Sequence, residues 1–128
     1  MTKNFTGVVI KESLERPALL GKITITKTKV EKITARHQTP WLKKWTLHSI
    51  EVPEGEAEII AKKLSLALDS RHSWYADFKN DKIHYIIFHG RVFKINRRSA
   101  KQYAEAKQYG ISLGIPAYQV NFRPMIKK

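Results

Sequence analysis

A chain of 128 residues is long enough for one domain with its own core, and 42% hydrophobic with 27% charged residues is ordinary for a globular protein. The chain has no cysteine, which excludes disulfides, thiolate nucleophiles and cysteine-ligated metal centres. The first residues contain only a short apolar run, and no window is long enough to span a membrane. We therefore expect a cytoplasmic protein without a membrane partner.

The formal net charge of +13 is unevenly distributed along the chain. Residues 22–44 hold seven Lys/Arg and one acid, and residues 91–128 hold nine and one, whereas residues 45–90 hold five bases and seven acids. Two basic segments flanking a slightly acidic one suit a phosphate-bearing partner, either nucleic acid or a phosphorylated small molecule. The alternative is a surface whose charge only keeps the protein in solution.

The first half of the chain predicts strands. Residues 5–11 form the first, and residues 22–36 alternate Ile and Thr with Lys as a long second strand. Lysines along that strand suit the edge of a sheet, and a slip in the alternation between Ile25 and Val30 predicts a β-bulge. Residues 42–52 predict the next strand.

The second half predicts a helix, a three-strand meander, a second helix and a short strand. These elements are expected over residues 54–72, 74–80, 82–88, 91–96, 99–114 and 117–122. Ser99 and Gln102 form a capping-box pattern for the second helix, which Gly110 or Gly114 can end. The order predicts one α+β domain over residues 1–128. We expect an antiparallel sheet with two main helices packed on one face, close to ferredoxin-like folds.

A turn at Asn80-Asp81 joins the first two strands of the meander. If its loop has two or four residues, Asp77 lies opposite His84, and a three- or five-residue loop removes the pair. The carboxylate then holds the imidazole and fixes its tautomer, as in the base half of many hydrolytic sites. Asp77 and His84 are thus catalytic candidates for a small enzyme with a cleft. The alternative is a structural pair.

The same register gives the meander two apolar faces. Tyr75, Ile86, Phe88, Phe93 and Ile95 lie on the face that carries Asp77 and His84. Because one helix layer covers only the opposite face, something else must cover this one. We predict a ligand cleft lined by Tyr75, or a homodimer interface.

The known catalytic and phosphate-binding motifs do not occur in the sequence. The five histidines show no metal-ligand spacing, so we predict neither a metal nor a cofactor.

Two clusters of residues suit a nucleic acid ligand. Trp41 and Trp45 flank Lys43 and Lys44, as rings and cations do in single-strand binding proteins. The alternative is that Trp45 lies in the core and Trp41 packs over a sheet edge. Arg97 and Arg98 precede a predicted helix N-terminus, which favours phosphate. The leading interpretation is a binding module for an anionic partner, with a small enzyme and a homodimeric interaction module as alternatives.

Four segments, WYADFKN, HYIIF, VFKINR and YGISLGIPAYQVNF, together resemble a family of small bacterial proteins. The resemblance extends from FTGVVIKESLE to the last predicted strand. It implies a compact single-domain protein and carries no activity, cofactor or residue role.

Overall fold

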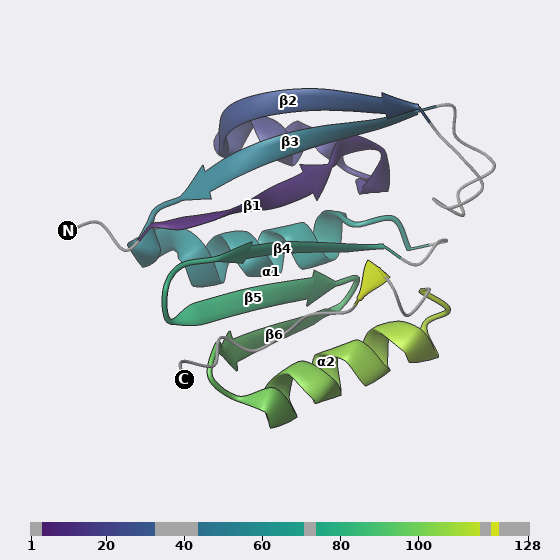
Figure 1. Ribbon diagram of the computed structural model, residues 1–128. Coiled ribbons are helices and arrows are strands. Elements are labelled where there is room, and N and C mark those ends of the chain that lie inside the picture. Colours follow the sequence, from purple (N-terminus) through teal and green to yellow (C-terminus); the bar gives the residue numbers. More distant parts are fainter. Residues whose placement is uncertain (1–3, 33–43, 71–73, 116–118, 121–128) are drawn as a thin grey trace.

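The computed structural model describes residues 4–32, 44–70, 74–115 and 119–120 of the chain (Figure 1). Its elements are β1 (Phe5–Ile10), β2 (Thr24–Lys32), β3 (Lys44–Val52), α1 (Ala57–Ala67), β4 (Tyr75–Lys79), β5 (Ile83–Phe88), β6 (Arg91–Asn96) and α2 (Ala100–Ser112). Short 3-10 helices lie at Lys11–Ser13, Pro17–Lys22 and Glu54–Glu56. The predicted α+β class is confirmed. The predicted last strand lies outside the described residues except for Gln119 and Val120.

The strands form one antiparallel sheet in the order β2-β3-β1-β4-β5-β6 (Figure 1). Both β3 and β4 pair antiparallel with β1, so they run parallel to each other with β1 between them. The helix α1 connects β3 to β4. This split βαβ unit is the feature that the protein shares with ferredoxin-like folds.

The strand β2 lies at one edge of the sheet, as its lysines predict. Its register against β3 shifts between Ile25 and Lys27, so the predicted bulge is confirmed. Every residue of β2 except Glu31 is exposed to solvent. The edge strand is therefore held by its ladder to β3 and contributes little to the core.

One face of the sheet packs on α1. The apolar residues of this helix that recur at helical spacing are buried, at Ala57, Ile60, Ala61, Leu64 and Leu68. They pack with the sheet residues Phe5, Val9, Ile50, Val52, Phe78, Tyr85 and Ile87. Ile59 and Leu66 lie outside this stripe and are 58% and 59% exposed.

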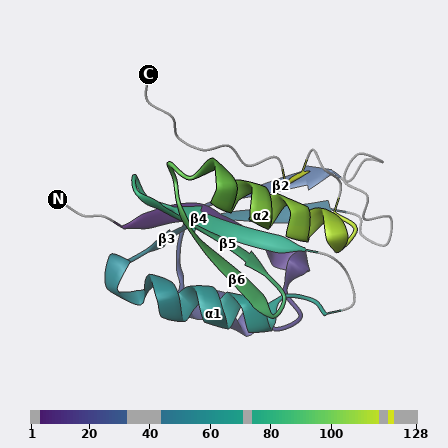
Figure 2. The same ribbon diagram turned by 90° about the horizontal axis from the view of Figure 1, so that it is seen from below.

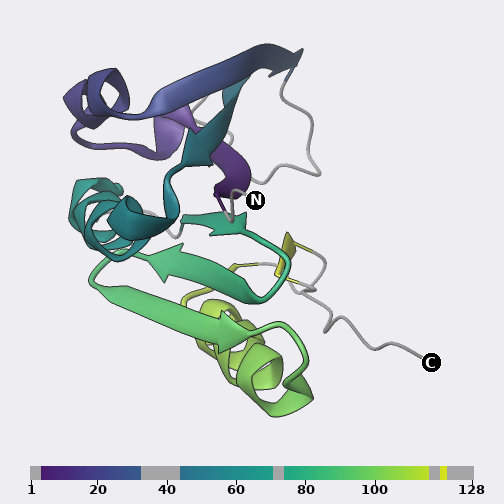
Figure 3. The same cartoon turned by 90° about the vertical axis from the view of Figure 1, so that its left-hand side faces the viewer.

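The helix α2 lies on the opposite face of the sheet, beside β4, β5 and β6 (Figures 2 and 3). A second cluster joins Ile86, Phe88 and Ile95 of the sheet to Tyr103 and Ala106 of α2, together with Ile115 and Val120. The prediction that both helices pack on one face is therefore wrong. The predicted division of the meander residues between two faces is correct, and α2 covers the second of these faces. This removes the reason for expecting a second subunit there.

Both ends of α2 follow from the sequence. The Ser99 hydroxyl accepts a hydrogen bond from the backbone N–H of Gln102 at 3.2 Å, as the capping pattern predicts. At the other end Gly114 has a φ of 92°, and the N–H of Ile115 donates to the carbonyl of Gly110. Gly110 lies within the helix, where a Cβ would approach Val120 Cγ1 to 2.9 Å. A residue without a side chain thus brings α2 close to the buried Val120.

Candidate functional site

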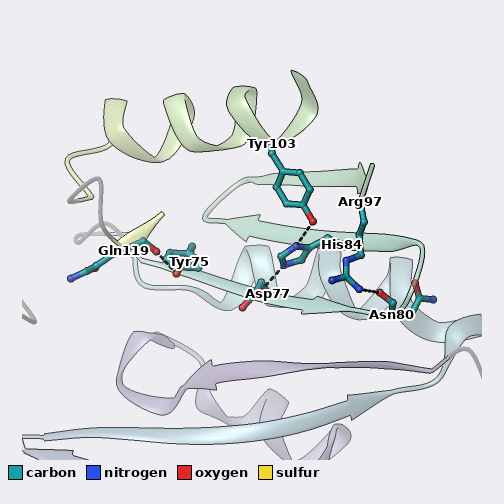
Figure 4. A network of polar contacts seen from close by, with 7 residues as sticks. All are labelled: Tyr75, Asp77, Asn80, His84, Arg97, Tyr103 and Gln119. Atoms are coloured by element: carbon teal, nitrogen blue, oxygen red, sulfur yellow. Dashed lines mark hydrogen bonds and ion pairs between the residues drawn. The ribbon is translucent and has the colours of Figure 1, made fainter. Parts of the chain in front are cut away.

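The side chains of Asp77 and His84 are in contact on the face covered by α2 (Figure 4). His84 Nε2 lies 2.7 Å from Asp77 Oδ2, and 5% of the histidine is exposed. Asp77 comes from β4 and His84 from β5. The predicted contact between the two residues is confirmed.

The register that produces this contact differs from the predicted one. Asp77 lies opposite Ile86, and His84 lies opposite Lys79. The loop consists of Asp81 and Lys82, because the N–H of Asn80 bonds to the carbonyl of Ile83. The pairing is thus shifted by two residues, and a shift of two keeps each side chain on its face. Asp77 and His84 therefore meet diagonally across the ladder, within reach of long side chains.

The second ring nitrogen of His84 contacts α2. His84 Nδ1 lies 3.0 Å from the hydroxyl of Tyr103 (Figure 4). A carboxylate only accepts, so Asp77 accepts a hydrogen bond from Nε2–H. This role assigns the Nε2–H tautomer to the neutral ring, with the Tyr103 hydroxyl donating to Nδ1. The result is a relay of hydrogen bonds from Tyr103 through His84 to Asp77.

This relay joins β4, β5 and α2 inside the protein. Burial raises the pKa of the Tyr103 hydroxyl above its ordinary value, although Arg97 acts in the opposite direction. Both nitrogens of His84 are engaged by residues of the chain itself, so neither is left to take a proton from a substrate. The geometry supports a structural role for Asp77 and His84: they position α2 on the sheet.

Tyr75, predicted to line a ligand cleft, lies on the same face and is half-buried. Its hydroxyl donates to the backbone carbonyl of Gln119 (Figure 4), and its ring packs beside Phe88. Burial, followed by the negative charge of Asp77, raises the pKa of the Tyr75 hydroxyl. Tyr75 therefore contacts residues close to the end of the chain.

The predicted cationic and aromatic contact residues do not form one site. Arg97 and Arg98 follow β6, whereas Lys44 and Trp45 begin β3 beside β2. From β3 to β6 there are four strand spacings, so about 19 Å separates the two groups. Trp41 and Lys43 lie outside the described residues.

Two of these residues have packing roles. Trp45 is half-buried against the α1 side of the core, and its ring lies 5.4 Å from that of Trp74. Arg97 donates to the carbonyl of Asn80 at 2.7 Å. Arg98 and Lys44 are exposed. The packing alternative for Trp45 is therefore the one that the structure supports.

A different group of cations comes together on the edge of the sheet. We call residues 24–32 of β2 and the paired residues 44–51 of β3 the basic ribbon. Its lysines are Lys27, Lys29, Lys32 and Lys44, and its acids are Glu31 and Glu51. Lys32 lies directly opposite Lys44, a cross-strand arrangement in which like charges repel.

A carboxylate fixes the base of the basic ribbon. β1 pairs with β3 only over Leu47–Val52, and Glu12 follows the end of β1. The Glu12 carboxylate accepts from the backbone N–H of Thr46 at 2.6 Å and from its hydroxyl at 2.8 Å. Burial alone raises the pKa of Glu12. These hydrogen bonds and the charge of Lys44 lower the pKa by more than burial raises it, so the pKa lies below its ordinary value.

Sequence reasoning did not name Tyr103, Glu12, Lys27, Lys29 or Lys32 as site residues. The signal for the lysines was present, because residues 22–44 were recognised as a basic segment and the lysines of this strand as typical of a sheet edge. Tyr103 shares a helix face with Ala106 and Gly110, but helical spacing alone does not reveal a partner on another element.

The described residues contain no group of three or more His, Cys, Asp or Glu side chains that could hold a metal ion. Within the same part of the chain, no helix is long and apolar enough to cross a membrane. No family model, curated protein or solved structure matches the chain. The resemblance to a family of small bacterial proteins stays a prediction.

Proposed function

We propose that the protein binds nucleic acid, and that the basic ribbon is the surface that contacts the phosphates. The observation that carries the proposal is the state of β2. This strand is exposed along its whole length except at Glu31, and its side chains include Lys27, Lys29 and Lys32. Lysines on an exposed, ordered strand neutralise phosphates and release counterions, which is the main source of affinity in sequence-independent binding.

The spacing of the lysines favours a long polyanion over a phosphorylated small molecule. From Lys27 to Lys32 the strand advances by five residues, or about 17 Å. A small phosphorylated ligand needs cations that converge on one point, as in a pocket with a few placed polar groups. Cations strung along a strand suit a partner with phosphates at regular intervals.

Lysines at a sheet edge also have a simpler explanation, since they discourage pairing with other chains. The two explanations differ in what happens when the charge is removed. If the lysines only protect the edge, their loss promotes association of the protein and leaves its weak affinity for nucleic acid unchanged. If they contact phosphates, their loss weakens binding more than the loss of equal charge elsewhere.

The test compares two triple variants that lower the net charge equally. One carries Lys27→Gln, Lys29→Gln and Lys32→Gln in the basic ribbon. The control carries three substitutions at other exposed lysines, Lys62→Gln, Lys63→Gln and Lys101→Gln. Fluorescence anisotropy with a mixed-sequence oligonucleotide gives Kd over a series of salt concentrations.

We expect the wild-type Kd to rise steeply with salt. For each phosphate that the ribbon variant no longer neutralises, the slope of log K against log salt should become shallower by about 0.9, whereas the control should retain the slope. Equal effects of the two triple variants would show that only overall charge matters. No binding by the wild type at low ionic strength would refute the proposal.

A further inference from the structure

The two faces of the basic ribbon both carry lysines. The ladder from Lys27 to Lys32 has no further shift in register, so side chains alternate regularly between faces. Lys27 and Lys29 therefore project from one face, and Lys32 projects from the other. Lys44 lies opposite Lys32 and shares its face. A partner that contacts all four lysines must present phosphates to both faces.

The outer end of the ribbon is two strands wide. The last residue pair between β1 and β3 is Ile10 with Leu47. Beyond it, residues 30–32 of β2 pair with residues 44–46 of β3, and no third strand joins them in the described part of the chain. On the β1 side of this segment the N–H of Thr46 is already bound by Glu12. The segment extends past β1 as a two-stranded ribbon with a fixed base (Figure 3).

We infer that this ribbon enters the major groove of duplex DNA. This inference rests on the proposed function and names the class of nucleic acid. The B-form major groove is about 12 Å wide, admits a two-stranded β-ribbon, and has a phosphate backbone on each wall. With β2 entering edge first, Lys27 and Lys29 face one wall of such a groove, and Lys32 and Lys44 face the other. Of the four lysines, only Lys32 and Lys44 lie on the segment that is two strands wide.

Two other nucleic acids fit the ribbon less well. Single strands are usually held by aromatic rings that stack on the bases, whereas β2 has no aromatic residue and Trp45 of β3 is half-buried beside Trp74. Duplex RNA has a deep and narrow major groove that does not admit side chains in this way. Lysine contacts to phosphate carry no base information, so we expect little dependence on DNA sequence.

The experiment measures Kd by anisotropy for duplex DNA, single-stranded DNA and duplex RNA of one length and mixed sequence. A fourth probe is the same DNA duplex with glucosylated 5-hydroxymethylcytosine, which fills the major groove and leaves the minor groove free. Each probe is tested with the wild type and with two double variants, Lys27→Gln/Lys29→Gln and Lys32→Gln/Lys44→Gln. Circular dichroism establishes that both variants are folded.

We expect plain duplex DNA to bind at least about tenfold more tightly than the other three probes at low salt. Each double variant should weaken that binding by about tenfold or more, because each removes two cations that neutralise phosphates. Equal or tighter binding of single strands, duplex RNA or glucosylated DNA would overturn the inference and leave nucleic acid binding intact. An effect of only one double variant would also overturn it. Failure of every probe to bind would refute the proposed function itself.

Discussion

The meander, β4 to β6, and the basic ribbon belong to the same sheet but are built in opposite ways. In the meander both faces are covered, by α1 on one side and α2 on the other, and five of the six residues of β5 are buried. In the ribbon, β2 is exposed nearly throughout. The polar groups differ as well, because the meander hides a closed relay and the ribbon presents lysines to solvent.

This difference separates residues that stabilise the fold from residues left available for a partner. A buried polar network is costly when it is incomplete, and the relay from Tyr103 to Asp77 pairs both nitrogens of His84. Lysines on an exposed strand add little stability. Substitutions in the meander should therefore change folding, and substitutions in the ribbon should change binding.

The largest effect is expected at Gly7, on the strand that joins the two regions. A Cβ on Gly7 would lie 2.0 Å from the carbonyl oxygen of Asp77 and 2.5 Å from Phe78 Cα. Both atoms belong to the backbone, so Gly7→Ala must displace β1 from β4. We expect a loss of at least about 3 kcal/mol in the free energy of unfolding, measured by chemical denaturation.

Gly55 provides the matched control for this substitution. A Cβ there has no heavy atom within 4 Å, so Gly55→Ala should change the free energy of unfolding by less than about 1 kcal/mol. If Gly7→Ala were equally mild, the close contact of β1 with β4 would not be what joins the two regions.

A smaller effect is expected when the relay is interrupted. Tyr103→Phe leaves Nδ1 of a buried His84 without its donor, which costs about 1–3 kcal/mol. Tyr109→Phe is the control, since the ring of Tyr109 packs on Phe88 whereas no hydrogen bond of its hydroxyl occurs among the described residues. Denaturation of both variants measures the difference. Equal stabilities would show that the relay does not hold α2 in place.

The relay also shows what sequence reasoning can and cannot recover. The loop of the first hairpin lies one residue later than predicted, which shifts the strand pairing by two residues. Asp77 and His84 were nevertheless correctly placed on one face, because side chains alternate with a period of two. The edge position of β2 and its bulge could also be predicted, because both depend on the order of lysines and apolar residues along one strand.

The position of α2 could not be recovered in this way. Its buried face is made of Tyr103, Ala106 and Gly110, which are weak signals of amphipathicity beside the stripe of α1. Which face of the sheet a helix covers depends on contacts between distant segments, here with Phe88 and Val120. The arginine and tryptophan clusters were separated for the same reason, since strand order decides which segments are neighbours.

Glu12 tests how the ribbon is joined to the rest of the protein. Glu12→Gln replaces one acceptor oxygen with an NH₂ group that faces a donor of Thr46, so we expect a loss of about 1–2 kcal/mol. Hydrogen exchange should increase most at residues 44–47, and Glu105→Gln at an exposed position should leave it unchanged. Because the pKa of Glu12 is lowered in the folded state, its contribution is present above its ordinary pKa and is lost as pH falls. Unchanged exchange in the ribbon would exclude Glu12 as its anchor.

Tyr75 gives the meander a response to alkaline pH. Its pKa is raised in the folded state by burial and by Asp77, so its contribution to stability is complete below a pH of about 10 and is lost as pH rises beyond that. Unfolding by urea should therefore become easier between pH 9 and about 11, and Tyr75→Phe should reduce this change. A variant with the full wild-type pH dependence would show that Tyr75 does not contribute to it.

The smallest effects on stability are expected in the ribbon. Lys27→Gln and Lys29→Gln should each change the free energy of unfolding by less than about 0.5 kcal/mol, because exposed side chains away from the core rarely contribute more. Lys32→Gln should stabilise the protein slightly, by about 0.2–1 kcal/mol, because it removes the repulsion between Lys32 and Lys44.

The sign of the Lys32→Gln effect distinguishes a binding surface from a structural one. A lysine that opposes a lysine lowers the stability of the free protein, and a phosphate bound between the two adds a favourable interaction in the complex. Lys32→Gln should thus raise the Tm of the free protein and reduce the increase in Tm that duplex DNA produces. Destabilisation of the free protein would mean that Lys32 is part of the fold, and the contrast between meander and ribbon would fail at this residue.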